Sequence, residues 1–128
     1  MPVPVTALYA AILGVLVTAF AMNVTLTRMK LGISLGDGGN ARMSRMVRIH
    51  GNAVEYVPMA LLLMIAYELN RGTGVVLHTA GIALIASRLL HAFALWSSDE
   101  PTPIRGAGQM LTWLIIMVLA ILNVLKIM

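Results

Sequence analysis

The sequence predicts an all-α integral membrane protein, a single domain over residues 1–128 built as an up-down bundle of four transmembrane helices. Two observations predict this class. Of the 128 residues, 59% are hydrophobic and 11% are charged, whereas a soluble domain is roughly half apolar and about a quarter charged. Four apolar stretches are each long enough to cross about 30 Å of hydrocarbon at a rise of about 1.5 Å per residue. They are residues 3–27, 43–70, 74–96 and 104–127.

The first stretch is expected to be a retained helix and not a signal peptide. Ala19-Phe20-Ala21 resembles a cleavage site. However, no Lys or Arg precedes Arg28, and the apolar run exceeds the roughly 7–15 residues of a signal-peptide core.

The second stretch carries a group of polar side chains within "SRMVRIHGNAVEYVP", residues 44–58. Four of them are spaced by three, four and three positions, so they form one stripe along a helix, while His50 points elsewhere. The stripe consists of Arg45, Arg48, Asn52 and Glu55.

Glu55 lies about three turns into this helix, where an unpaired carboxylate costs several kcal/mol. It is therefore expected to pair with Arg48, with Arg88 or with the cation of a ligand. Arg45 has two interpretations: it belongs to the same polar site, or it extends to the membrane surface and contacts anionic lipid.

The third and fourth stretches place further polar residues at the same end of the bundle. The connections are short, and short connections make consecutive helices antiparallel neighbours. Arg88 and His91 near the end of the third helix, and Arg105 at the start of the fourth, therefore meet the polar stripe. His91 is either a ligand-binding residue or a histidine that is hydrogen-bonded between helices, and Arg105 is either part of the site or paired with Asp99 or Glu100.

Other polar residues are expected to have structural roles. Asn23 and Asn123 are predicted to form hydrogen bonds between helices. His78, near the opposite end of the third helix from His91, is also interpreted as structural. Pro101 and Pro103 suit the entry into the fourth helix.

The distribution of Lys and Arg predicts the orientation in the membrane. Basic residues cluster around the first connection, whereas the other side has only Arg71 and Lys126. Cytoplasmic loops are enriched in such residues, so the first and third connections should face the cytoplasm and both termini should lie on the non-cytoplasmic side. The clustered residues are Arg28, Lys30, Arg42, Arg45 and Arg48.

Several classes of function are excluded or unsupported. No cysteine occurs, so disulfides, thiolate metal sites and a cysteine nucleophile are excluded. The "GDGGN" turn lacks the GK[ST] of a phosphate-binding loop. The net charge of +4 is explained by the membrane orientation, so no nucleic acid binding is expected, and no metal site is predicted.

The run "SLGDGGN…RMVRIHGNAVEYVP", followed by "SRLLHA" and "PIRGAGQ", resembles the MAPEG family, the membrane-associated proteins of eicosanoid and glutathione metabolism, and in particular its bacterial branch. The resemblance covers essentially the whole chain. It implies a homotrimer of four-helix subunits in the bacterial inner membrane. Glutathione, as a co-substrate, would be held between neighbouring subunits near the cytoplasmic face, and a lipophilic molecule would arrive from the bilayer lipids.

The resemblance also implies roles for individual residues. Those that match family residues around glutathione are Arg48, Asn52, Glu55 and His91, with Arg105 as the catalytic residue that stabilises the thiolate. Arg45, His50 and Arg88 are further candidates. The residue that helix one contributes is left open between Asn23 and Arg28. Departures from the eicosanoid-metabolising relatives at Gly51, Leu95 and Gly106 argue against specialised prostaglandin or leukotriene synthesis.

Three hypotheses remain from the sequence. The first is a glutathione-dependent transferase or peroxidase that acts on lipophilic electrophiles. The second is a non-catalytic lipid-binding or scaffold protein of the same fold, for which Arg105 would not be needed. The third is a transporter or channel component, which polar residues gathered at one membrane face disfavour, because a transport path needs polar groups through the full depth.

Overall fold

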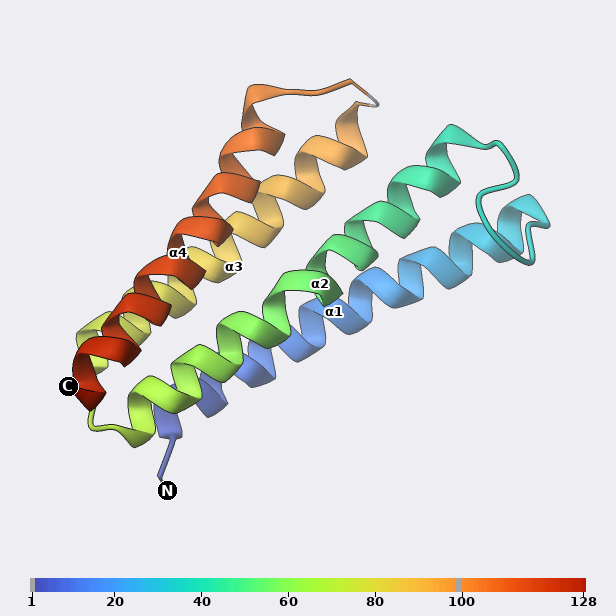
Figure 1. Cartoon of the computed structure of the whole chain (residues 1–128). Helices are drawn as coiled ribbons and strands as arrows, with labels where there is room; N and C mark the ends of the chain where they lie inside the picture. The colour runs from blue at the N-terminus through green and yellow to red at the C-terminus, as the bar shows by residue number, and fades with distance from the viewer. Residues whose placement is uncertain (1, 99) are drawn as a thin grey trace.

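The computed structural model describes residues 2–98 and 100–128 and contains four helices (Figure 1). All four are long and apolar enough to cross a membrane. The predicted all-α membrane fold is therefore confirmed. The helices are α1 (Pro4–Leu31), α2 (Ala41–Leu69), α3 (Gly74–Ser97) and α4 (Pro103–Ile127).

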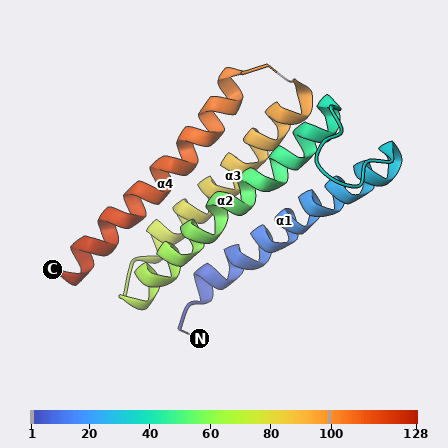
Figure 2. The same cartoon turned by 45° about the vertical axis from the view of Figure 1, so that its right-hand side comes forward.

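The four helices run up and down, and the two termini lie at the same end of the bundle (Figure 1). α2 and α3 each contact three other helices, whereas α1 and α4 lie at opposite edges and do not contact each other (Figure 2). The loop 32–40 and residues 98 and 100–102 therefore lie at the end opposite the termini.

The first helix ends at Leu31 and not at residue 27, where the prediction ended it. Gly32 stops it in the left-handed conformation with φ 66°, and its N–H bonds to the carbonyl of Arg28. Arg28 and Lys30 lie in the last turn, where cations are favourable beside the negative end of the helix dipole. The helix therefore continues beyond the end of the apolar run.

Side chains cap the starts of α1 and α2. Asn40 Oδ1 accepts a hydrogen bond from the N–H of Met43 at 3.0 Å and so begins α2. At the start of α1, residue Val3 provides no such cap. Instead both carboxylate oxygens of Glu68 in α2 accept from the N–H groups of Val5 and Thr6, at 2.9 and 2.8 Å. Glu68 thus satisfies two of the free donors of α1 and fixes this helix to α2.

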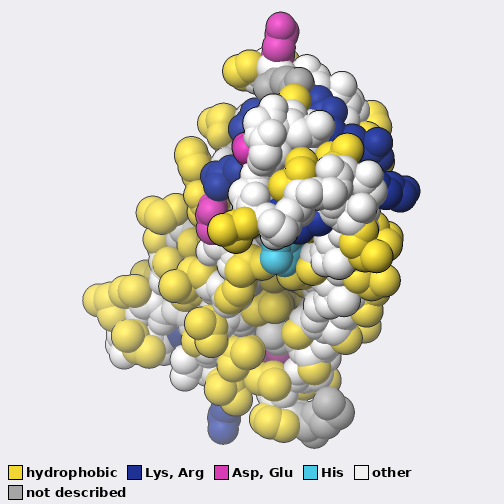
Figure 3. Space-filling view, turned by 90° about the vertical axis from the view of Figure 1, so that its right-hand side faces the viewer, with side chains coloured by type: hydrophobic (Ala, Val, Ile, Leu, Met, Phe, Trp, Pro, Cys, Tyr) yellow, Lys and Arg dark blue, Asp and Glu magenta, His cyan; other side chains and the backbone are white. Residues whose placement is uncertain are grey.

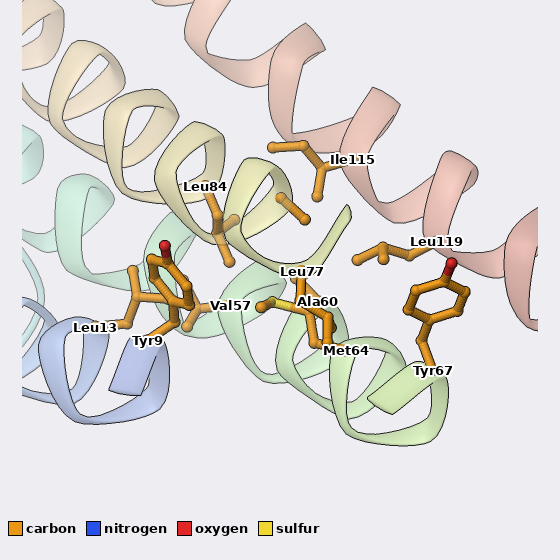
Figure 4. Close-up of a cluster of buried hydrophobic side chains, with 11 residues drawn as sticks. Tyr9, Leu13, Val57, Ala60, Met64, Tyr67, Leu77, Leu84, Ile115 and Leu119 are labelled. Atoms are coloured by element: carbon orange, nitrogen blue, oxygen red, sulfur yellow. The ribbon is translucent and has the colours of Figure 1, made fainter. Parts of the chain in front are cut away.

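The main hydrophobic core fills the half of the bundle near the termini, with contributions from all four helices (Figure 4). Tyr9 of α1 packs over Gly81 of α3, where an added Cβ would lie 2.3 Å from the ring. The hydroxyl of Tyr9 hydrogen-bonds His78 Nδ1 at 3.0 Å. The structural role predicted for His78 is therefore confirmed. The labelled side chains include Leu13, Val57, Met64, Leu84, Ile115 and Leu119.

The two asparagines predicted to connect helices do so. Asn23 of α1 donates to the sulfur of Met46 in α2 at 2.7 Å. Asn123 of α4 donates to the carbonyl of Leu63 in α2 at 3.0 Å. These bonds fix α1 and α4 to α2 from its two sides.

α3 and α4 approach each other closely at Gly108. An added Cβ there would lie 2.9 Å from the backbone nitrogen of His91 and 3.0 Å from the carbonyl oxygen of Ser87. Both contacts are with backbone, so a side chain at Gly108 would push the two helices apart. This contact determines the position of His91 and of the polar groups around it.

Gly108→Ala is expected to destabilise the protein by about 1–3 kcal/mol, because the overpacking can be relieved only by a shift of α3 against α4. Gly106 provides a matched control on the same helix, since nothing lies within 4 Å of its added Cβ. Gly106→Ala should instead stabilise the helix by about 0.5–1 kcal/mol. Thermal unfolding in detergent measures both changes, and equal midpoints for the two variants would contradict the close packing.

Candidate functional site

The charged side chains gather at the end of the bundle opposite the termini. In Figure 3, most of the visible Lys and Arg side chains lie over the upper part of the molecule, while hydrophobic side chains cover most of the lower part. The predicted gathering of polar residues at one end is therefore seen in the fold.

A cavity of about 290 Å³ opens within this charged end. Its walls come from α2, α3, α4 and the loop that precedes α4. The residues that line it are Arg48, Asn52, Tyr56, His91, Pro101, Thr102, Arg105, Gly106, Gln109 and Trp113.

One wall consists of Arg48, Asn52 and Tyr56 on successive turns of α2, since they are four residues apart. Asn52 is buried, with 3% of its surface exposed. Arg48 Nη1 lies 3.1 Å from Glu55 Oε1, and these two side chains are 53% and 48% exposed. The predicted polar stripe thus follows the edge between the interior of the chain and its outer surface.

Glu55 pairs with Arg48, which was one of the three partners considered for it. Among the described residues it forms no ion pair with Arg88, and it does not line the cavity. Glu55 is therefore placed to orient the guanidinium of Arg48, or to exchange that contact for a cationic group of a ligand.

The opposite wall comes from α4, where Arg105, Gln109 and Trp113 also lie on successive turns. Thr102 caps this helix, because its Oγ1 accepts from the N–H of Arg105 at 3.2 Å. Pro103 is the first residue of the helix, as predicted. Arg105 is thus in the first turn, where the positive end of the helix dipole adds to the field of its guanidinium.

A neighbouring cavity of about 360 Å³ shares Arg48 and Arg105 with the first. Arg45 also lines it, together with Leu95. Of the two partners considered for Arg105, Asp99 lies outside the described residues, and Glu100 forms no ion pair with it in the described part of the chain. Three arginines therefore surround two adjoining spaces at this end of the bundle.

Arg88 lies behind the cavity and does not line it. It is 2% exposed, and its guanidinium lies 6.0 Å from the centre of the Tyr56 ring. It donates to neutral acceptors on α2 and α4, so it connects three helices. The acceptors are Asn52 Oδ1, Thr112 Oγ1 and the carbonyl oxygen of Gly108, the last at 3.3 Å.

The bond from Arg88 determines which end of the Asn52 amide is available to the cavity. Since Oδ1 of Asn52 accepts from Arg88, the remaining end is the amide nitrogen, which can only donate. His91 of α3 completes the wall and is 5% exposed. The cavity thus presents two guanidinium groups and an amide donor, a set that favours an anionic ligand.

Not all the residues selected from the sequence meet at this cavity. His50 does not line either polar cavity. Asn23 faces a separate apolar groove between α1 and α3. Arg28 donates to the carbonyl of Gly36 in the first loop at 2.7 Å. Neither of the helix-one candidates therefore reaches the cavity within one chain.

Six lining residues were not selected from the sequence as site residues, and three of these carry large side chains on α2 and α4: Tyr56, Gln109 and Trp113. The signal that could have found them is helical spacing. Tyr56 lies one turn beyond Asn52, and Gln109 and Trp113 lie one and two turns beyond Arg105.

No set of three or more His, Cys, Asp or Glu side chains in residues 2–98 and 100–128 is placed to hold a metal ion.

The fold and the cavity together define a four-helix membrane protein with a cationic cavity at one end of its bundle. The MAPEG family model matches residues 6–125. The inner membrane protein YecN of Escherichia coli strain K12 is 39% identical over 118 residues, or 91% of this chain and 88% of that protein. The protein of the same name from the O6:H1 strain of Escherichia coli has the same identity and coverage. The chain therefore belongs to the MAPEG family.

Proposed function

We propose that this protein is a glutathione-dependent transferase or peroxidase that acts on lipophilic electrophiles. The observation that carries the proposal is the placement of Arg48 and Arg105, from two different helices, on one cavity with the amide of Asn52. Family membership supports a role in glutathione chemistry at the level of the family.

The residues around the cavity fit the chemistry of glutathione. The tripeptide has two carboxylates, one ammonium and one thiol. Guanidinium groups bind carboxylates with paired hydrogen bonds, and Arg48 supplies such a group, which leaves Arg105 on the same cavity to face the thiol. Glu55, which pairs with Arg48 in the free protein, would receive the ammonium, and Asn52 would donate to a carboxylate.

Arg105 is proposed to activate the thiol. A free thiol has a pKa of about 8.5, so only a few per cent is the nucleophilic thiolate at neutral pH. A guanidinium beside the sulfur favours the anion and lowers this pKa. The thiol proton passes to water, the thiolate forms a C–S bond to the electrophile, and the leaving group departs with the electron pair of the bond that breaks.

The site is proposed to be completed by neighbouring copies in a homotrimer. Arg48 and Glu55 are each about half exposed in the single chain, and exposing charged groups to lipid is costly. A second copy that covers this edge removes the cost. We further place this end at the cytoplasmic face of a bacterial inner membrane, with both termini on the other side, because the basic residues lie around it.

Calorimetric titration of the detergent-purified protein with glutathione and S-hexylglutathione tests the proposal. Both ligands should bind and compete, because they share the charged groups that the arginines would hold. Light scattering, corrected for detergent, should give the mass of a trimer for the same sample. Absence of binding by both ligands would instead support a lipid-binding or scaffold protein of this fold.

A further inference from the structure

The side chain of Gln109 lies on the wall of the cavity, and the burial of its amide is not explained by any hydrogen bond among the described residues. Its Nε2 and Oε1 atoms are both buried, and neither has a hydrogen-bond partner within the described chain. A buried polar group without a partner costs about 1–3 kcal/mol. Most buried polar groups in native proteins are satisfied, so an unpaired amide at a cavity wall indicates a missing partner.

The buried side-chain amide of Asn123 differs from that of Gln109, because one of its two ends is hydrogen-bonded. Its Nδ2 donates to the carbonyls of Leu63 and Leu119, and its Oδ1 alone is unpaired. Asn123 therefore has a structural role, and it lines no polar cavity. Gln109 combines two unpaired ends with a place on the cavity wall, one turn from Arg105.

The chemistry of the amide restricts what can satisfy it. Nε2 is a donor and Oε1 is an acceptor. A carboxylate would satisfy only the donor, and an ammonium would satisfy only the acceptor. The C=O and N–H of one trans peptide group point in opposite directions, whereas the N–H and C=O of one extended residue point to the same side. The backbone of a single peptide residue can therefore satisfy both ends of a glutamine side chain.

We propose that Gln109 is a specificity-determining residue that binds the backbone N–H and C=O of one peptide residue in the thiol ligand. This inference rests on the proposed function. It specifies the ligand class as a peptide thiol whose charged ends are held by arginines and whose backbone amide is held by Gln109. Thiols without a peptide bond would leave the amide unpaired and would bind more weakly.

The test compares glutathione with two analogues, each of which has one peptide N–H replaced by an ester oxygen. Affinities are measured by calorimetry for the parent, for Gln109→Leu and for Asn123→Leu as a control. The parent should bind one of the two analogues at least about fivefold more weakly than glutathione, the effect of leaving a buried group unpaired. The affinities of Gln109→Leu for that analogue and for glutathione should agree within about twofold, because this variant can no longer recognise the N–H of the ligand.

Thermal stability provides a second readout. Gln109→Leu removes an unpaired buried amide, so its melting temperature without ligand should equal or exceed that of the parent. Asn123→Leu removes two hydrogen bonds that are made, so it should melt earlier and should keep the ligand preference of the parent.

Two results would overturn the inference about Gln109 while leaving the proposed function intact. The first is that the parent binds glutathione and both ester analogues equally. The second is that Gln109→Leu retains the full preference of the parent. A parent protein that does not bind glutathione at all would remove the proposed function, and the inference with it.

Discussion

Arg105→Ala is expected to keep most of its affinity for glutathione and to lose at least about tenfold in turnover, or about 1.4 kcal/mol of transition-state stabilisation. The reason is that Arg105 is proposed to stabilise the thiolate, whereas Arg48 would continue to hold a carboxylate of the ligand. The rate of conjugation of glutathione to chlorodinitrobenzene measures this loss. Without the cation the thiol pKa is higher, so the activity of the variant should rise only at higher pH than that of the parent.

A lysine at position 105 separates the effect of charge from that of side-chain geometry, and a substitution at Arg42 provides a control. Arg105→Lys should recover part of the loss, because the charge remains but the planar fork of donors does not. Arg42→Ala removes an arginine from the same end of the bundle that lines neither polar cavity, so its turnover should equal that of the parent. If Arg105→Ala turns over like the parent at neutral pH, Arg105 does not stabilise the thiolate.

Arg88→Met should lower the free energy of unfolding by about 2–4 kcal/mol. The substitution removes the donor to the buried oxygens of Asn52 and Thr112, whereas the carbonyl of Gly108 still accepts from Thr112 Oγ1 at 3.2 Å. Each buried acceptor left unpaired costs about 1–3 kcal/mol. Loss of a buried cation that has no acidic partner among the described residues offsets part of this cost. Thermal unfolding in detergent measures the net change.

The same variant should also bind glutathione more weakly, because Asn52 loses the contact that orients its amide nitrogen toward the cavity. Arg88→Lys should restore little of either property, since one ammonium cannot reproduce the fork of donors that spans α2 and α4. Arg42→Ala again serves as the control. A melting temperature equal to that of the parent for Arg88→Met would show that Arg88 does not hold the three helices together.

The fold was predictable because apolar length alone specifies membrane helices. The prediction placed the end of the first helix at residue 27, where the apolar run ends, but the helix continues through the polar residues Arg28 and Lys30 to Leu31. The capping of α1 by Glu68 was not predictable, because it joins residues that are 62 and 63 positions apart. Such a contact depends on how α1 and α2 are aligned, which spacing within one helix does not determine.

The candidate site was predicted in part. Helical spacing and the antiparallel order of the helices placed Arg48, Asn52, His91 and Arg105 at one end, and these four residues do line one cavity. Arg88 was considered for ligand binding, but it lies behind the wall, since it is at the interior face of α3. Its partners could not be inferred, because the face of a helix that meets its neighbours is fixed by packing.

The spectrum of bound glutathione is the most direct test of the proposal that this cavity binds and activates the thiol. Thiolates absorb at about 240 nm, whereas thiols do so only weakly. Addition of glutathione to the parent at neutral pH should produce a saturable thiolate band, and the same addition to Arg105→Ala should produce a much smaller band. Saturable binding of glutathione by the parent without a thiolate band, or an equal band in both proteins, would contradict the account.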